Sequence, residues 1–256
     1  MITKIWMKSR SLLIFAICYL VGCNNDVSQL PINEQAIQRS NRFSDDIAKD
    51  GYRKPLEVLN FIQIKPGMAV VDILGGGGYY SELFSHIVGQ NGQVYLQNNS
   101  LFLRFSKKEL TKRLKNNRLK NVIRLDSEYA DMKLPSNVDV LFFGLSFHDF
   151  FVQRDDPVIT AIPESFIKQI TASLKPGGLL IVLDHSSEAN IGIGKTSQLH
   201  RIDEKWVQKK LKSEGFIFLE KLDNLRHPND DFSLDIWNKK VFHKTDRFIH
   251  IYQLEN

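Results

Sequence analysis

Cysteine is nearly absent from this 256-residue chain, which contains only Cys18 and Cys23, both close to the N-terminus. The chain beyond Cys23 therefore has no thiol that an oxidising compartment could damage. Proline is also scarce, at 8 residues, while 43% of the residues are hydrophobic and 25% are charged. Such a composition is typical of a globular chain that buries one sizeable core in a single domain.

A large excess of charge of one sign is missing as well. The formal net charge is +5, but Lys4, Lys8 and Arg10 lie in an N-terminal extension without acids, which leaves 31 basic against 29 acidic groups elsewhere. This balance gives no reason to expect a nucleic-acid partner. The basic run KKELTKRLKNNRLK at 107–120 is predicted to be a solvated helix face.

The N-terminus has no apolar run of the length needed for a comfortable membrane span. A basic start precedes the apolar residues 12–21, a pattern typical of an export signal. The sequence Leu-Val-Gly-Cys at 20–23 resembles the bacterial lipobox, which implies a signal peptide at 1–22 and acylation of Cys23. Residues 23–34 are then a polar tether, and the lipid bilayer of the cell envelope is a partner. A non-cleaved anchor helix, a fortuitous cysteine and a different start codon remain alternatives.

Residues 35–256 are predicted to form the single folded domain. Apolar positions between residues 34 and 64 indicate two helices with a break near Asp50-Gly51. Buried-type strands are then predicted at 69–74, 93–97, 122–125, 138–143, 179–183, 216–222 and 247–252. Helices are predicted between them at 79–88, 102–114, 162–174 and 203–214. This alternation predicts an α/β fold with a doubly wound, mostly parallel sheet and an antiparallel hairpin at one edge.

The segment VVDILGGGGYYSEL at 70–83 combines a strand, a glycine-rich turn and a helix start, which together present backbone N–H groups to a ligand. A dinucleotide site needs a third glycine where this chain has Tyr80 or Ser81, depending on the alignment. A phosphate loop needs a Gly-Lys-Ser/Thr ending, which is absent here. The match ANIGIGKT at 189–196 lies too far from its strand, so we interpret it as accidental.

The motif of 70–83 resembles that of the class I S-adenosylmethionine-dependent methyltransferases, in which an acid is followed by alternating glycines. Asp72, Gly76 and Gly78 match this pattern, whereas Leu74 stands where the first glycine is expected. The segment FIKQITASLKPGGLLIVLDH at 166–185 resembles the family's fourth helix, its Leu-Lys-Pro-Gly-Gly turn and its fifth strand. The resemblance thus covers nearly the whole domain. Together with FHDF, LHRID and KTDRF, this segment is closest to predicted bacterial methyltransferases with a signal peptide.

The resemblance implies a Rossmann-like class I methyltransferase fold of seven strands, with S-adenosylmethionine as the cofactor. It also implies where the cofactor binds. Asn98 stands where an acid normally contacts the ribose, and Asp126 corresponds to the residue that contacts adenine. The implied cofactor-binding residues are Asp72, Gly75, Gly76, Gly78, Tyr79, Asn98, Asp126 and Gly144.

Polar side chains follow the fourth and fifth strands, which are neighbours in the strand order that the methyltransferase resemblance implies. His148 and Asp149 follow the fourth strand, and Asp184 and His185 end the fifth. Ligands in open α/β sheets bind beyond the carboxyl ends of such strands, so we predict His148, Asp149 and His185 as catalytic residues. His148 is the candidate base or substrate orienter, unless the pair only caps the next segment.

A further pair, His200 and Arg201, follows the glycine-containing loop. No ligand spacing demands a metal, so none is expected, although these imidazoles and carboxylates could converge on one.

The sequence thus predicts a methyltransferase that acts on an unidentified small molecule. Its export signal conflicts with this function, because S-adenosylmethionine is made in the cytosol. The alternative is a non-catalytic, membrane-anchored lipoprotein that retains the fold, and a metal-dependent enzyme is a third hypothesis.

Overall fold

Seven strands form one sheet in the order β3-β2-β1-β4-β5-β7-β6 in the computed structural model, which describes residues 27–255. The predicted signal peptide and Cys23 lie outside these residues. The strands are β1 (Ala69–Ile73), β2 (Gln93–Asn98), β3 (Val122–Asp126), β4 (Val138–Gly144), β5 (Leu174–His185), β6 (Phe216–Leu222) and β7 (Arg247–Leu254). All seven predicted strands are confirmed. The sheet has the class I methyltransferase order, with its switch point between β1 and β4.

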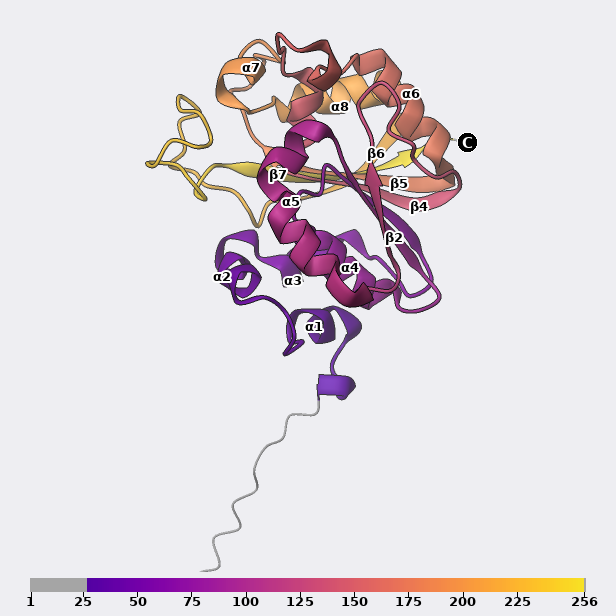
Figure 1. The fold of residues 1–256 in the computed structure, drawn as a ribbon. Helices are drawn as coiled ribbons and strands as arrows, with labels where there is room; N and C mark the ends of the chain where they lie inside the picture. Colours follow the sequence, from indigo (N-terminus) through magenta and orange to yellow (C-terminus); the bar gives the residue numbers. More distant parts are fainter. Residues whose placement is uncertain (1–26, 256) are drawn as a thin grey trace, which may run out of the picture.

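The first five strands are parallel to one another, and β7 runs antiparallel to both β5 and β6. The predicted edge hairpin is therefore confirmed. Its two strands are joined by the long segment 223–246, which extends beyond the end of the sheet (Figure 1). Val70, Val71 and Ile73 of β1 are completely buried, as expected of a central strand covered on both faces.

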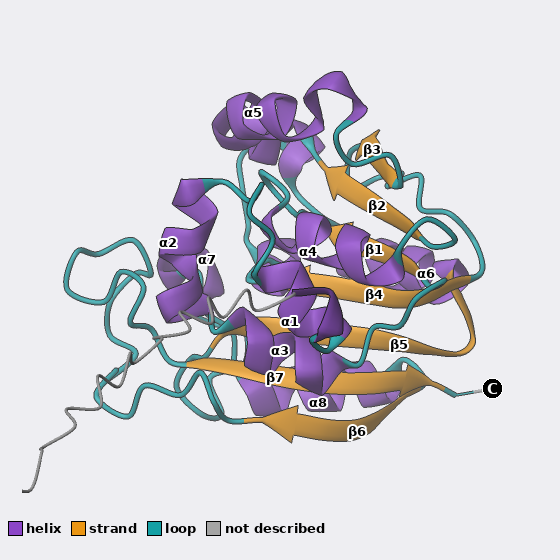
Figure 2. Ribbon diagram, turned by 90° about the horizontal axis from the view of Figure 1, so that it is seen from below, coloured by secondary structure: helices purple, strands orange, loops and turns teal. Residues whose placement is uncertain are grey.

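Helices cover both faces of the sheet (Figures 1 and 2). They are α1 (Ile32–Ile37), α2 (Ser44–Arg53), α3 (Pro55–Ile62), α4 (Tyr79–Val88), α5 (Ser100–Leu114), α6 (Pro163–Ser173), α7 (Thr196–Leu199) and α8 (Glu204–Ser213). Side chains of α1, α3 and α4 form the core on one face, and those of α6 and α8 belong to the core on the other. Among residues 27–255, no helix combines the length and apolar character needed to cross a bilayer.

The N-terminal region differs from the prediction in two places. The predicted tether is already helical at Ile32, where α1 begins. The predicted break near Asp50-Gly51 is wrong, because α2 continues through this pair to Arg53. The break occurs at Lys54, whose backbone is left-handed with φ 45°, and Pro55 then starts α3. Proline suits the first position of a helix because it has no N–H to leave unpaired.

The basic run at 107–120 is only in part the solvated helix face that was predicted. Most of its charged side chains are exposed, but Arg113 is completely buried. Its guanidinium lies 2.7 Å from Asp46 of α2, 2.9 Å from Glu109, and in contact with Glu82 of α4. Helical spacing predicts the pair with Glu109 at i,i+4, but it does not reveal the pairs with Asp46 and Glu82, because other helices supply these acids.

The Arg113 network yields a prediction about stability. Replacing Arg113→Met leaves the buried carboxylates of Asp46 and Glu82 with less compensation, so the free energy of unfolding in urea falls by about 3 to 5 kcal/mol. The matched control is Arg124→Met, which breaks the exposed pair with Asp126 and costs at most about 1 kcal/mol. Equal losses in the two variants would contradict the role assigned to Arg113.

Candidate functional site

The glycine-rich turn connects β1 to α4 at the switch point of the sheet. Gly76 and Gly78 have positive φ angles of 57° and 82°, and Gly78 is the N-cap of α4. The turn is held from β2, because the Gly75 N–H donates to the Gln97 carbonyl at 3.1 Å. The predicted strand, turn and helix start are confirmed, and the turn lines a pocket at the carboxyl end of β1.

This pocket, which we call the glycine pocket, has a volume of about 210 Å³. It is lined by Lys49, Arg53, Asp72, Leu74, Gly75, Gly76, Gly77, Tyr79, Tyr80, Glu109, Gly144 and Leu145. A Cβ at Gly75 would lie 2.4 Å from Leu96 and 2.6 Å from Asp72, and a Cβ at Gly144 would lie 2.8 Å from Phe142. Glycine is therefore required at these positions by close packing. A ligand in this pocket would lie against bare backbone.

Asp72 lies at the base of the glycine pocket and is buried. Its Oδ2 accepts a hydrogen bond of 2.6 Å from the Ser81 hydroxyl. Burial raises the pKa of Asp72 to about 6, although the Ser81 hydrogen bond opposes this effect. Asp72 is thus still mainly ionised at neutral pH.

Leu74 replaces the first glycine of the motif and adopts the backbone conformation that glycine favours. Its φ is 52°, which costs a residue with a side chain about 1 to 2 kcal/mol. Its side chain belongs to the hydrophobic core, and its N–H donates to Gln97 Oε1 at 3.2 Å. The turn thus accommodates Leu74 in a left-handed conformation, with its side chain in the core and its N–H hydrogen-bonded.

The structure shows which groups hold Asn98 and Asp126, and the contacts predicted between these residues and the cofactor stay predictions. Asn98 Oδ1 accepts from the Gly76 N–H at 2.8 Å, and its Nδ2 donates to the Gly76 carbonyl at 3.0 Å. Both polar atoms thus hold the turn and neither faces the glycine pocket. Asp126 is exposed, ion-paired with Arg124 at 2.6 Å, and contributes to neither pocket described here.

Two polar residues at the same strand ends were missed from the sequence. Asn99 Nδ2 and Glu128 Oε2 are buried and have no hydrogen-bond partner among the described residues. The second polar atom of each side chain is used locally, since Asn99 Oδ1 caps α5 by accepting from the Phe102 N–H and Glu128 Oε1 accepts from the Ser100 N–H. In the sequence, the only signal for these two residues is their place beside Asn98 and Asp126, the residues predicted to contact the cofactor.

A larger cavity of about 500 Å³ adjoins the glycine pocket, and Arg53 and Leu145 line both. We call it the histidine pocket. Its other lining residues are Tyr52, Leu101, Phe102, Phe105, His148, Asp149, Arg154, His185, His200, Ile236, Trp237, Phe242, His243, Thr245 and Arg247. The three residues predicted to be catalytic are therefore brought together in one cavity.

Aromatic residues divide between the core and the pockets. Tyr79 and Tyr80 are buried in a hydrophobic cluster and also line the glycine pocket. The clusters also contain Phe142, Phe143, Phe147, Phe150 and Phe151, which line neither pocket. The segment 223–246 supplies Trp237 and Phe242 to the histidine pocket. Sequence reasoning missed these two residues, because an irregular polar segment carries no periodic signal.

His148 is buried and tightly held by Asp184 at the end of β5. Its Nδ1 lies 2.8 Å from Asp184 Oδ1, and its backbone N–H donates to Asp184 Oδ2 at 2.7 Å. Burial alone would lower the pKa of His148, but the charges of Asp184 and Asp149 outweigh burial and raise the pKa to about 9. His148 is thus a cation at neutral pH, which suits an orienting hydrogen-bond donor better than the predicted base.

His185 and His200 differ from His148 in charge. Burial, reinforced by the positive charge of His148, lowers the pKa of both imidazoles. His185 Nδ1 lies 2.7 Å from the Thr245 hydroxyl, so this ring is fixed in the pocket wall. His185 is therefore neutral and can accept a hydrogen bond, but a pKa lowered this far makes it a weak base, so its predicted catalytic role stays a prediction.

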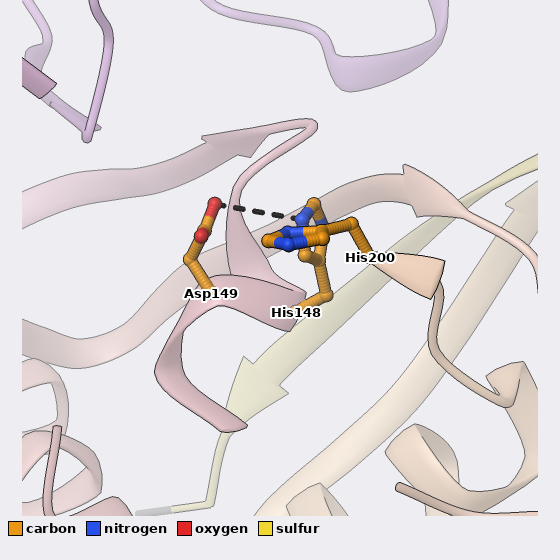
Figure 3. A group of neighbouring side chains, drawn as sticks. All are labelled: His148, Asp149 and His200. Atoms are coloured by element: carbon orange, nitrogen blue, oxygen red, sulfur yellow. Dashed lines mark ion pairs between the residues drawn. The ribbon is translucent and has the colours of Figure 1, made fainter. Parts of the chain in front are cut away.

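A metal could be held only by His148, Asp149 and His200 among the described residues, whose ligand atoms lie within 4.8 Å of one another (Figure 3). His200 Nδ1 is buried without a partner, which suits a ligand. However, Asp149 is paired with Arg154 at 2.5 Å, and a metal must displace the proton of His148. We therefore assign no metal to this site.

The crowding at Gly75 yields a second prediction. In Gly75→Ala the new Cβ would overlap Leu96 and Asp72, so we expect a loss of about 1 to 3 kcal/mol in the free energy of unfolding. The control is Gly51→Ala in α2, where a Cβ meets nothing within 4 Å, and stability should rise by about 0.5 to 1 kcal/mol. Urea denaturation measures both. A stable Gly75→Ala variant would show that the turn is looser than described.

The raised pKa of His148 yields a third prediction. Because its folded pKa is about 9 and lies above that of an unfolded histidine, about 6.5, its stabilising contribution is complete below the unfolded value. This contribution is lost as pH rises through about 9. Urea midpoints of the wild type should fall over this interval, and those of His148→Gln should fall less. Parallel pH profiles would contradict the assignment.

Known proteins resemble this chain in sequence and in fold. The family model of protein-L-isoaspartate(D-aspartate) O-methyltransferase matches residues 55–130. A ubiquinone/menaquinone biosynthesis C-methyltransferase of Shewanella woodyi is 29% identical over 140 residues, which cover 53% of this chain and 50% of that protein. The protein of the same name from Shewanella sediminis is 30% identical over 126 residues, covering 48% and 44%. The chain thus aligns with about half the length of these curated relatives.

A solved structure extends the likeness to most of the domain. The structure of an S-adenosylmethionine-dependent methyltransferase from Aquifex aeolicus superimposes with a TM-score of 0.58 at 22% identity. The match covers 82% of this chain and 94% of that one. At this identity it establishes the fold, and it confirms the fold class predicted from the sequence.

Proposed function

We propose that the chain is a class I S-adenosylmethionine-dependent methyltransferase that transfers a methyl group to a small molecule held in the histidine pocket. The observation that carries this proposal is the junction of the two pockets at Arg53 and Leu145. The glycine pocket offers bare backbone beside an acid, and the histidine pocket offers space and proton-handling groups. A donor and an acceptor bound there would meet at the shared wall.

The chemistry divides between the cofactor and the protein. Bound S-adenosylmethionine would supply an electrophilic methyl group on sulfur. The protein positions the acceptor, excludes water and removes the proton that the acceptor loses. His185 is the candidate base, which burial keeps neutral, and the protonated His148 would orient the acceptor by donating a hydrogen bond. Asn98, Asn99, Asp126 and Glu128 all lie outside the lining of the glycine pocket, and the unpaired buried atoms of Asn99 and Glu128 make these two additional candidates for contact with the nucleoside.

Ligand binding tests this proposal through Asp72. We expect S-adenosylmethionine to raise the melting temperature of the wild-type protein. In Asp72→Asn the shift should be much smaller, because the carboxylate that faces the glycine pocket loses its charge. The control is Ser81→Ala, which removes the hydrogen bond to Asp72 but keeps the carboxylate and should keep the shift. A wild-type protein without any shift at millimolar ligand would instead favour the non-catalytic alternative, for which the methyltransferase relatives give no support.

We further propose that the chain is exported and anchored to the cell-envelope membrane through acylated Cys23. The basic start, the short apolar run and the lipobox-like sequence support this proposal. A cofactor supply outside the cytosol is then required for activity. In Cys23→Ser, palmitate labelling and membrane fractionation should both be lost, whereas Cys18→Ser should leave both unchanged. Labelling that survives in Cys23→Ser would contradict the lipoprotein assignment.

A further inference from the structure

Two arginines in the histidine pocket have no acidic partner among the described residues. Arg247, the first residue of β7, is 2% exposed, and its Nε is buried without a hydrogen bond. The Arg247 guanidinium makes one hydrogen bond, which its Nη2 donates to the Tyr52 carbonyl at 2.8 Å. Arg53, the last residue of α2, also has a buried, unpaired Nε, and its guanidinium lies over the Tyr79 ring at 4.5 Å.

Arg53 is half-buried, whereas Arg247 is buried and differs from the other buried arginines in residues 27–255. Arg42 is paired with Asp50, Arg113 with Asp46, and Arg201 with Asp230. A buried guanidinium without a partner is costly, because it has lost water without gaining an opposite charge. Burial and the charge of nearby Arg53 lower the pKa of Arg247, as expected of two cations that repel each other.

The acids at the histidine pocket are paired with other groups, while Asp72 in the adjoining glycine pocket interacts with Arg53 through its charge without an ion pair. Asp149 pairs with Arg154, Asp184 with His148, and Asp246 with Arg226. Asp50 accepts from both Arg42 and the Tyr79 hydroxyl. Neither guanidinium therefore has an ion-pair partner among the described residues, and the negative charge of a ligand would supply one. Arginine is suited to this role because its paired N–H donors bind a carboxylate.

The rest of the pocket wall is apolar and aromatic. Phe105 is 76% exposed, Trp237 is 56% exposed and Phe242 is 47% exposed, and all three line the histidine pocket. Exposed large aromatic side chains gathered at a cavity mark a surface that an apolar ligand covers. They come from α5 and from the segment 223–246.

We propose that the methyl acceptor is a carboxylic acid with an apolar, ring-bearing body. Its carboxylate binds Arg53 and Arg247, and its body packs against Phe105, Trp237 and Phe242. This inference rests on the proposed function, because it names the acceptor of that same site. The cofactor also has a carboxylate, and Arg53 borders both pockets. Arg247 lines only the histidine pocket and so distinguishes the two sources.

The experiment uses the full chain and two probes of equal shape, 2-naphthoate and neutral 2-naphthamide. Calorimetry measures their binding in the presence of saturating S-adenosylhomocysteine, and measures S-adenosylmethionine separately. We expect the wild type to prefer naphthoate to naphthamide by about tenfold or more. Arg247→Gln should abolish this preference while the affinity for S-adenosylmethionine stays unchanged. Arg104→Gln, which removes an exposed arginine outside both pockets, is the charge-matched control and should change nothing.

A stability measurement separates binding from folding. Since Arg247→Gln removes a buried, unpaired charge, its melting temperature should equal or exceed that of the wild type. Equal binding of naphthoate and naphthamide by the wild type, or a preference that survives in Arg247→Gln, would overturn the proposal. Weaker S-adenosylmethionine binding with naphthoate unaffected would assign the site to the cofactor and also overturn it. Naphthoate binding without any binding of S-adenosylmethionine or S-adenosylhomocysteine would contradict the proposed function and support the carboxylate site.

Discussion

The close approach of the 74–78 backbone to its surroundings is the constraint on which the rest of this site depends. At Gly75 a Cβ would lie 2.4 Å from Leu96 and 2.6 Å from Asp72, so a side chain there would displace its neighbours and destabilise the turn. β2 reinforces it, since Asn98 holds Gly76 through both of its polar atoms. The packing that stabilises the turn therefore also leaves backbone exposed to a ligand, and Leu74 adopts a left-handed conformation within the same turn.

The arginines in the frame, by which we mean the helices and loops outside the two pockets, are paired differently from the arginines in the histidine pocket. In the frame, the buried cations Arg42, Arg113 and Arg201 each have a carboxylate within ion-pair distance, and such pairs hold helices and loops in place. In the histidine pocket, Arg53 and Arg247 lack one. The free energy that a buried, unpaired charge costs is often tolerated at functional sites, because a ligand recovers it on binding. The unpaired arginines are thus a functional signal that the fold alone does not provide.

Much of the fold could be predicted because its central strands are long apolar runs bounded by turns. β1 and the glycine turn follow directly from VVDILGGGG, and the edge strands follow from their position after the last long helix. The predictions fail where a tertiary contact decides the outcome. Lys54 adopts a left-handed conformation that no local pattern requires, Arg113 is drawn inward by acids on other helices, and Asn98 turns toward Gly76. The unpaired state of Arg247 cannot be seen in sequence at all, since it depends on which carboxylates lie nearby.

The central claim is that donor and acceptor meet where the two pockets join. A crystal structure of the protein with S-adenosylhomocysteine tests it most directly. The account predicts that the amino-acid part of this ligand lies against Gly75 and Gly76, with its sulfur directed toward the wall formed by Arg53 and Leu145. A ligand bound elsewhere, or one whose sulfur points away from the histidine pocket, would contradict the account.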